Sequence, residues 1–117
     1  MLLRGIIITK EHRETVFDLT PVEGEATYDL LNKAKCIIDQ QFKPDGYNVG
    51  WNVGKVGGQE VFHAHLHVLP RYADELYAGR GIRYWIKQSE NSGGFTIDIF
   101  EGEFLYESDN ILDKIYG

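Results

Sequence analysis

Three of the chain's four histidines alternate with apolar residues in one short stretch. His63, His65 and His67 are separated by Ala64 and Leu66. Successive side chains of an extended strand point to opposite faces, so the pattern predicts three imidazole rings on one face. Neighbouring rings would then lie roughly 6–7 Å apart. Rings at that spacing can share one phosphate group or one metal ion.

Two kinds of chemistry fit such a row. In one, an imidazole attacks phosphorus and its neighbours orient it, because histidine is partly neutral at pH 7 and leaves well once phosphorylated. In the other, the row chelates a metal, which would need a further ligand such as Glu60 or His12 and an open coordination position. A merely solvated face is disfavoured, because three histidines repel when protonated and need partners when buried neutral.

The residues before the row favour phosphate. Asn52 precedes the glycine-rich loop of residues 54–58, and glycine lets backbone N–H groups come close to an anion. Gln59 follows this loop at the entry to the histidine strand, where its amide can donate to a phosphate oxygen.

The histidine row needs a sheet to hold it, and the flanking sequence predicts one. Residues 5–9 form a β-branched run typical of a strand buried on both faces. Residues 47–53 are predicted as a second strand, and residues 60–69 as the histidine strand, which Pro70 should end.

One main helix is predicted between the first two strands. Thr20-Pro21-Val22-Glu23 is a capping box with proline at the first helical position, and the helix should run to about residue 41. A shorter helix is expected over residues 73–78, ended by Gly79. The apolar stripe of the main helix consists of Ala26, Leu30, Leu31, Ala34, Ile37 and Ile38. Together these elements predict an α+β fold with an antiparallel sheet.

Composition limits the classes of protein to consider. With 117 residues, 43% of them hydrophobic, the chain fits a single domain. Its net charge of −6 gives no footprint for nucleic acid or an anionic membrane. One cysteine excludes an intramolecular disulfide, and no apolar run has the length of a membrane span or the pattern of a signal peptide. We therefore expect a soluble cytoplasmic protein.

Residues 63–69 match, at every position, the motif His-apolar-His-apolar-His-apolar-apolar. The flanks, residues 58–62 and 70–72, and the preceding strand, residues 44–52, are similar as well. On these residues the chain resembles the histidine triad (HIT) family over about residues 4–88. The resemblance implies a HIT-like antiparallel sheet with one main helix.

The resemblance also implies residue roles. His65 would be the nucleophile that attacks the α-phosphorus of a nucleotide and forms a nucleotidyl-histidine intermediate. His63 and His67 would position it and stabilise the phosphate, and His12 would support them from the neighbouring segment. The expected phosphate-binding residues are Asn52, Gln59 and Glu60, although many members have serine or threonine in place of Glu60, and a carboxylate there would weaken phosphate binding.

Activity and partners follow from the same resemblance. Family substrates are nucleoside phosphoramidates, adenylated amino groups and dinucleoside polyphosphates, so the expected partner is a purine nucleotide-type small molecule. No cofactor or metal is required for the covalent step, and members commonly form homodimers. A metal-dependent hydrolase and a nucleotide-binding module with weak turnover remain as alternatives.

The order of the segments departs from the family pattern. The tail, residues 95–117, resembles the segment with which family members usually begin, and residues 89–94 have the composition of a linker. We interpret this as a circular permutation of one domain, residues 1–117, with residues 1–88 as its main body. Asp113 would then be the candidate for the ribose hydroxyls. The alternative is a truncated member with an unrelated acidic hairpin as its tail.

Overall fold

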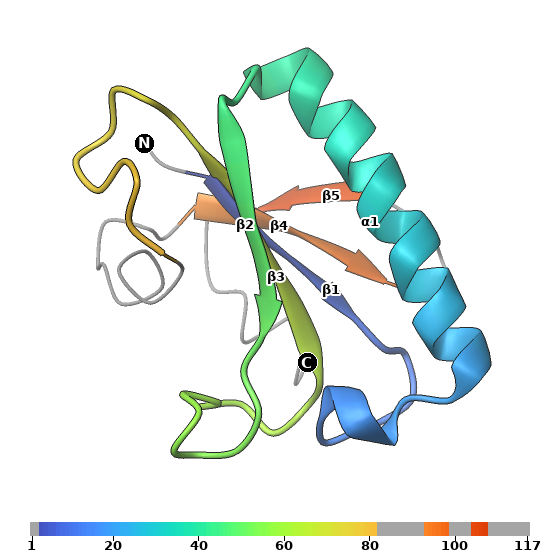
Figure 1. Cartoon of the computed structure of the whole chain (residues 1–117). Coiled ribbons are helices and arrows are strands. Elements are labelled where there is room, and N and C mark those ends of the chain that lie inside the picture. Colours follow the sequence, from blue (N-terminus) through green and yellow to red (C-terminus); the bar gives the residue numbers. More distant parts are fainter. Residues whose placement is uncertain (1–2, 82–92, 99–103, 108–117) are drawn as a thin grey trace.

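The computed structural model describes residues 3–81, 93–98 and 104–107, which form one five-stranded sheet with a long helix along it (Figure 1). The sheet order is β2-β3-β1-β4-β5. Among the described residues, no helix combines the length and apolar character that a membrane span needs. The elements are β1 (Leu3–Ile8), the 3-10 helix η1 (Val16–Asp18), α1 (Pro21–Phe42), β2 (Gly46–Trp51), β3 (His65–Arg71), β4 (Gly93–Asp98) and β5 (Phe104–Glu107).

The sheet is antiparallel except at one pair. β3 lies between β2 and β1 and runs antiparallel to both, whereas β1 and β4 are parallel. β5 pairs with β4 in an antiparallel hairpin at the edge of the sheet. The α+β prediction is confirmed, with this parallel pair as a difference. Gly93 and Gly94, which the sequence assigned to a linker, are the first residues of β4.

Local sequence explains both ends of α1. The Thr20 side chain accepts from the Glu23 backbone N–H, and the Glu23 carboxylate accepts from the Thr20 backbone N–H, which closes the capping box. Lys43 stops the helix in the left-handed conformation, with φ of 47°, and Pro44 follows, which cannot continue a helix. The helix therefore ends one residue beyond the predicted position.

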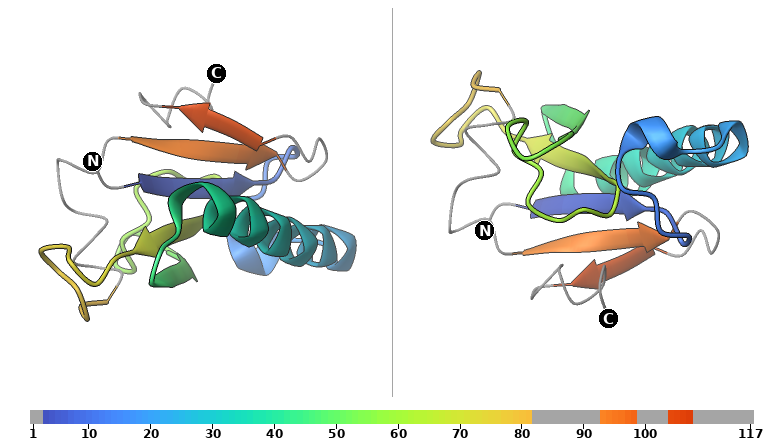
Figure 2. Two further views of the ribbon diagram at one scale, coloured as in Figure 1. Left: turned by 90° about the horizontal axis from the view of Figure 1, so that it is seen from above. Right: turned by 90° about the horizontal axis from the view of Figure 1, so that it is seen from below.

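Helix α1 covers one side of the sheet (Figure 2). Its buried residues recur at spacings of three and four, as in an amphipathic helix, and the apolar ones meet alternate residues of β1 and β3. This core consists of Ile7, Leu30, Ala34, Ile38, Leu66 and Val68. Because Leu66 and Val68 face the helix, His65 and His67 point to the opposite side of the sheet.

Two predicted elements differ from the structure by more than two residues, whereas the strands predicted at residues 5–9 and 47–53 agree with β1 and β2 to within two residues at each end. β3 begins at His65 instead of residue 60, and it continues through Pro70 to Arg71. Residues 73–79 form turns instead of a helix, because the Arg71 guanidinium donates to the carbonyls of Tyr77 and Arg80 and so holds this segment in a compact loop. The nucleoside-binding candidate Asp113 lies outside the described residues.

Candidate active site

His65 and His67 form the centre of the site. They come from the first residues of β3 and pair with Ile8 and Ile6 of β1. Their ring centroids lie 4.7 Å apart with an interplanar angle of 70°. His67 is buried, whereas His65 is half-buried. The alternation predicted from the sequence holds for these two histidines.

One hydrogen bond fixes the tautomer of His65. Its Nδ1 lies 2.7 Å from the main-chain oxygen of His63. A carbonyl oxygen can only accept, so Nδ1 carries the hydrogen and the neutral ring has its unprotonated nitrogen at Nε2. A nucleophilic imidazole needs this arrangement, because the attacking nitrogen must keep its lone pair.

His63 does not continue the row. It precedes β3, and its buried ring turns toward the end of β1, where Nε2 donates to the Thr9 carbonyl at 2.8 Å and lies 3.3 Å from the Thr9 hydroxyl. His12 meets the His63 ring edge-on at 5.3 Å between centroids. The prediction of three rings on one strand face is therefore wrong at His63, and the four histidines form two ring pairs.

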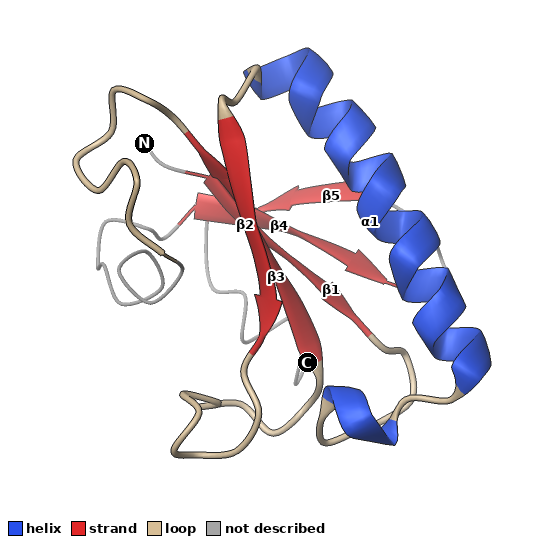
Figure 3. Ribbon diagram, viewed as in Figure 1, coloured by secondary structure: helices blue, strands red, loops and turns tan. Residues whose placement is uncertain are grey.

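Two loops are joined by hydrogen bonds next to these histidines, and both loops lie at the same end of the sheet (Figure 3). Residues 9–14 follow β1 and residues 59–64 precede β3. His12 Nε2 donates to the Phe62 carbonyl at 2.9 Å, and the Ala64 N–H donates to the Arg13 carbonyl at 2.6 Å. These bonds bend the chain away from strand geometry, which explains why β3 starts only at His65.

Gln59 is buried at the same junction. Its Nε2 donates to the carbonyls of Glu14 at 2.7 Å and Val61 at 3.1 Å, and its Oε1 accepts from the Gly54 N–H at 2.8 Å. The sequence predicts that this amide contacts phosphate, but both of its hydrogens are engaged within the protein. Gln59 therefore holds the loops together in this structure.

The glycine-rich loop is closed on itself. Its residues 54–58 form turns, and Gly57, Gly58 and Gln59 donate their N–H groups to carbonyls of Gly54 and Lys55. Gly57 is needed because a Cβ there would lie 2.2 Å from the Val53 carbonyl oxygen. These three N–H groups are not presented to an anion, which differs from the cradle predicted from sequence.

The remaining predicted phosphate residues lie near the site. Asn52 directly follows β2, whose last residue Trp51 pairs with Leu66, so Asn52 lies beside the start of β3. Its Nδ2 is 3.4 Å from the Gly58 carbonyl. Glu60 is exposed.

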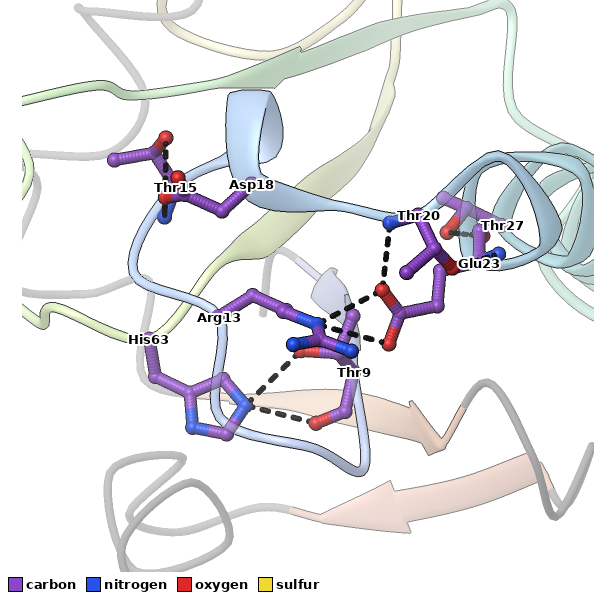
Figure 4. Close-up of polar contacts among 8 residues, drawn as sticks. All are labelled: Thr9, Arg13, Thr15, Asp18, Thr20, Glu23, Thr27 and His63. Atoms are coloured by element: carbon purple, nitrogen blue, oxygen red, sulfur yellow. Dashed lines mark hydrogen bonds and ion pairs between the residues drawn. The ribbon is translucent and has the colours of Figure 1, made fainter.

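Sequence reasoning missed an ion pair that ties the first loop to α1 (Figure 4). Arg13 Nε donates to both carboxylate oxygens of buried Glu23, at 2.9 and 3.2 Å. Burial raises the pKa of Glu23, but the hydrogen bonds from Thr20 and Arg13 outweigh it and hold the pKa below its ordinary value. The capping box made Glu23 visible in the sequence, but nothing local pointed to Arg13.

No group of three or more histidine, cysteine, aspartate or glutamate side chains within the described part of the chain is placed to hold a metal ion. In this arrangement His63 Nε2 and His65 Nδ1 each donate to a carbonyl, so these two nitrogens do not act as ligands. The geometry therefore favours the phosphate interpretation of the histidines.

A separate apolar hollow of about 340 Å³ lies on the helix-covered side of the sheet. It lies between η1, the first half of α1 and the edge strand β2. Its lining is Val16, Leu19, Gly24, Thr27, Tyr28, Leu31, Val49, Gly50, Trp51 and Leu66. Since Leu66 faces away from His65 and His67, the hollow is not part of the histidine site.

Comparison with known proteins identifies the family to which the chain belongs. The family model described as HIT domain matches residues 5–74, which include both histidine pairs. The chain belongs to the HIT family. The HIT protein called "Protein hit" in Bacillus subtilis is 36% identical over 67 residues, covering 57% of this chain and 46% of that protein. A solved structure of a HIT family protein from Bacillus anthracis is 33% identical, with a TM-score of 0.55, covering 70% of this chain and 60% of that one.

Two further relatives carry names that state an activity. Adenosine 5'-monophosphoramidase hnt1 of Schizosaccharomyces pombe is 32% identical over 77 residues, covering 66% of this chain and 55% of that protein. AP-4-A phosphorylase of Mycobacterium tuberculosis is 37% identical over 59 residues, covering 50% of this chain and 30% of that protein. The chain spans about half the length of the curated relatives it matches.

Proposed function

We propose that this HIT protein is a nucleotidyl hydrolase or transferase that uses His65 as its nucleophile. The observation that carries the proposal is the bond from His65 Nδ1 to the His63 carbonyl, which leaves Nε2 as the unprotonated ring nitrogen. The names of the two relatives, a phosphoramidase and a dinucleoside polyphosphate phosphorylase, support nucleotides as the substrate class.

The reaction has two steps. His65 Nε2 attacks the α-phosphorus, the bond from phosphorus to the leaving nitrogen or oxygen breaks, and the leaving group takes up a proton. Water then attacks the nucleotidyl-histidine and releases a nucleoside monophosphate together with the restored imidazole. During the first step the ring becomes cationic, and the His63 carbonyl stabilises that charge through the Nδ1 hydrogen.

The other residues take supporting roles in this proposal. His67, whose ring is next to that of His65, stabilises the phosphate or leaving group. His63 and His12 act through the loops, since their ring nitrogens donate to Thr9 and Phe62. Asn52 remains the nearest candidate for a phosphate oxygen, and Asp113 the candidate for the ribose.

Trapping the intermediate tests the proposal directly. The protein is mixed with adenosine 5'-phosphoramidate, quenched within seconds and digested for mass spectrometry. We expect an adenylyl group on the peptide that carries His65, and neither label nor turnover in His65→Gln. Substitution of Gln40, an exposed residue of α1, by alanine serves as the control and should leave both unchanged. Hydrolysis by His65→Gln at the wild-type rate would refute the assignment, and tight AMP binding without turnover would favour a binding module.

A second copy of the chain is the proposed partner in a homodimer. β2 is an edge strand of the sheet, so the backbone groups along its outer side can pair with another strand. The apolar hollow beside it, with Val49 and Tyr28 exposed, would be covered in the same contact. We also propose a cytoplasmic location, because the single cysteine fits a reducing compartment.

The segment order is also interpreted as a circular permutation. The β4–β5 hairpin joins the sheet beside β1, next to the strand pair that carries the site. A segment that completes the same sheet can be joined to either end of the chain where the connection is short. Residues 95–117 would thus belong to the one domain of residues 1–117, with residues 1–88 as its main body and residues 89–94 as the linker.

A further inference from the structure

We infer that the Arg13–Glu23 ion pair positions the nucleophile, although neither residue belongs to the two histidine pairs. The inference rests on the proposed role of His65. Its basis is a path from the first turn of α1 to His65 Nδ1. The path consists of three contacts, from Glu23 to the Arg13 side chain, from the Arg13 carbonyl to the Ala64 N–H, and from the His63 carbonyl to His65 Nδ1. Covalent bonds within Arg13 and within the His63–Ala64 peptide group connect these contacts.

The path begins at a fixed point. Glu23 is 2% exposed and lies in the first turn of α1. Its carboxylate accepts from the Thr20 N–H at 2.8 Å and from Arg13 Nε at 2.9 and 3.2 Å. A buried carboxylate held by these donors has little freedom to move. Arg13 lies in the loop between β1 and α1, so this ion pair fixes the loop at its middle (Figure 4).

The Arg13 main chain is hydrogen-bonded to the second loop, residues 59–64, and so restricts its position. Its carbonyl accepts from the Ala64 N–H at 2.6 Å, and the Ala64 N–H belongs to the same peptide group as the His63 carbonyl. That carbonyl accepts from His65 Nδ1 at 2.7 Å. Hydrogen bonds on the two ends of one peptide group polarise each other, so the bond from Ala64 makes the His63 carbonyl a better acceptor for His65.

The other bonds between the loops do not replace this one. Thr9 contacts the His63 side chain, His12 contacts the Phe62 carbonyl, and Glu14 contacts the Gln59 amide. Among these contacts between the two loops, only that of Arg13 involves the peptide group that orients His65. Loss of the ion pair should therefore loosen that peptide while the remaining bonds keep the two loops together.

The experiment compares Arg13→Ala and Glu23→Gln with the wild type by nitrogen-15 NMR of the imidazole rings and by hydrogen exchange of the Ala64 amide. In Arg13→Ala we expect Ala64 exchange to be faster by roughly three- to tenfold, the factor for one weakened hydrogen bond, and His65 to populate the Nε2–H tautomer. Glu23→Gln keeps an acceptor for Thr20 but loses the charge, and should change both readouts in the same direction. Arg13→Lys, which keeps the ion pair, should restore them.

The matched control is Lys35→Gln, which removes an exposed ion pair with Asp39 on the same helix and should change neither readout. An unchanged His65 tautomer and unchanged Ala64 exchange in folded Arg13→Ala would overturn the inference. If Arg13→Ala does not fold, Glu23→Gln decides by the same criterion. Both readouts are independent of turnover, so they hold even if the trapping of adenylyl-His65 fails. Where the wild type is active, kcat should fall with Arg13→Ala while KM stays within about twofold.

Discussion

The orientation of the His65 ring depends on the main chain of the motif and not on a side chain of the motif. Its ring is oriented by the His63 carbonyl, while the His63 side chain is turned away toward Thr9. In the proposed mechanism the motif thus supplies His65 as the nucleophile, His67 as the adjacent ring, and His63 as a third residue whose main chain orients His65. A histidine at position 63 then serves the loop contact with Thr9 and His12.

Gln59 can be used to test whether a residue predicted to bind phosphate instead holds the two loops together. Gln59→Leu leaves the Gly54 N–H and the carbonyls of Glu14 and Val61 without their partner. Of these three residues only Val61 is buried, and a buried polar group without a partner costs about 1–3 kcal/mol, so we expect the free energy of unfolding to fall by roughly 1–3 kcal/mol. Urea denaturation followed by circular dichroism measures it.

The control for that experiment is Gln41→Leu, because Gln41 is exposed near the end of α1. Its effect should lie within about 0.5 kcal/mol of zero. If Gln59→Leu instead unfolds at the wild-type urea concentration but binds AMP more weakly, Gln59 contacts phosphate as the sequence predicts, and the loop role is wrong.

Among the elements, those specified by local signals were predictable from sequence. The capping box at Thr20 and the apolar stripe of α1 act within a few residues, so both ends of the helix follow from the sequence to within one residue. The start of β3 does not, because residues 61–64 are bent by bonds to residues 9–14, which lie some 50 positions earlier in the chain. The same holds for residues 73–79, which are held by Arg71.

The candidate site was predictable to the same extent. His65 and His67 share a face because a strand alternates its side chains, and the motif made that visible. Arg13, Thr9 and the engagement of Gln59 depend on contacts between distant segments, which no local pattern encodes. Position 13 carries no motif of its own, and its importance follows from two contacts with distant segments, the ion pair of its side chain with Glu23 and the bond between its carbonyl and Ala64.

The N-terminus of α1 leads to a prediction about pH. The pKa of Glu23 is lower in the folded chain than its ordinary value of 4.5. The ionised carboxylate therefore stabilises the fold above about pH 4.5, and this contribution is lost as pH falls through the lower, folded-state pKa. We expect the wild type to be more stable than Glu23→Gln at pH 7 and the difference to shrink progressively as the pH falls below 4.5.

Urea denaturation of both proteins at several pH values measures this difference. Glu25→Gln is the matched control, since Glu25 is exposed two residues further along the helix, and its difference from the wild type should stay small throughout. A difference between the wild type and Glu23→Gln that does not change with pH would show that the ionised carboxylate is not what stabilises the first turn.

At the scale of the whole molecule, the two sides of the sheet are used differently. One side presents His65 and His67, and the other carries α1 and the apolar hollow at the edge strand β2. A hollow lined by Val16, Leu31 and Trp51 is unfavourable in water. Pairing of two β2 edges would cover it without touching the histidine side.

Val49 is the residue through which this arrangement can be tested. It is 46% exposed, lies in the middle of β2 and lines the hollow. Lysine on an edge strand opposes pairing with a second strand, so we expect the wild type to sediment as the proposed dimer and Val49→Lys to sediment as a monomer. Val56→Lys is the control, because Val56 is fully exposed in the loop of residues 54–58 and should leave the dimer intact. If Val49→Lys stays dimeric, the dimer interface does not include β2. If the Val49→Lys monomer still forms adenylyl-His65, the partner copy is not needed for the covalent step.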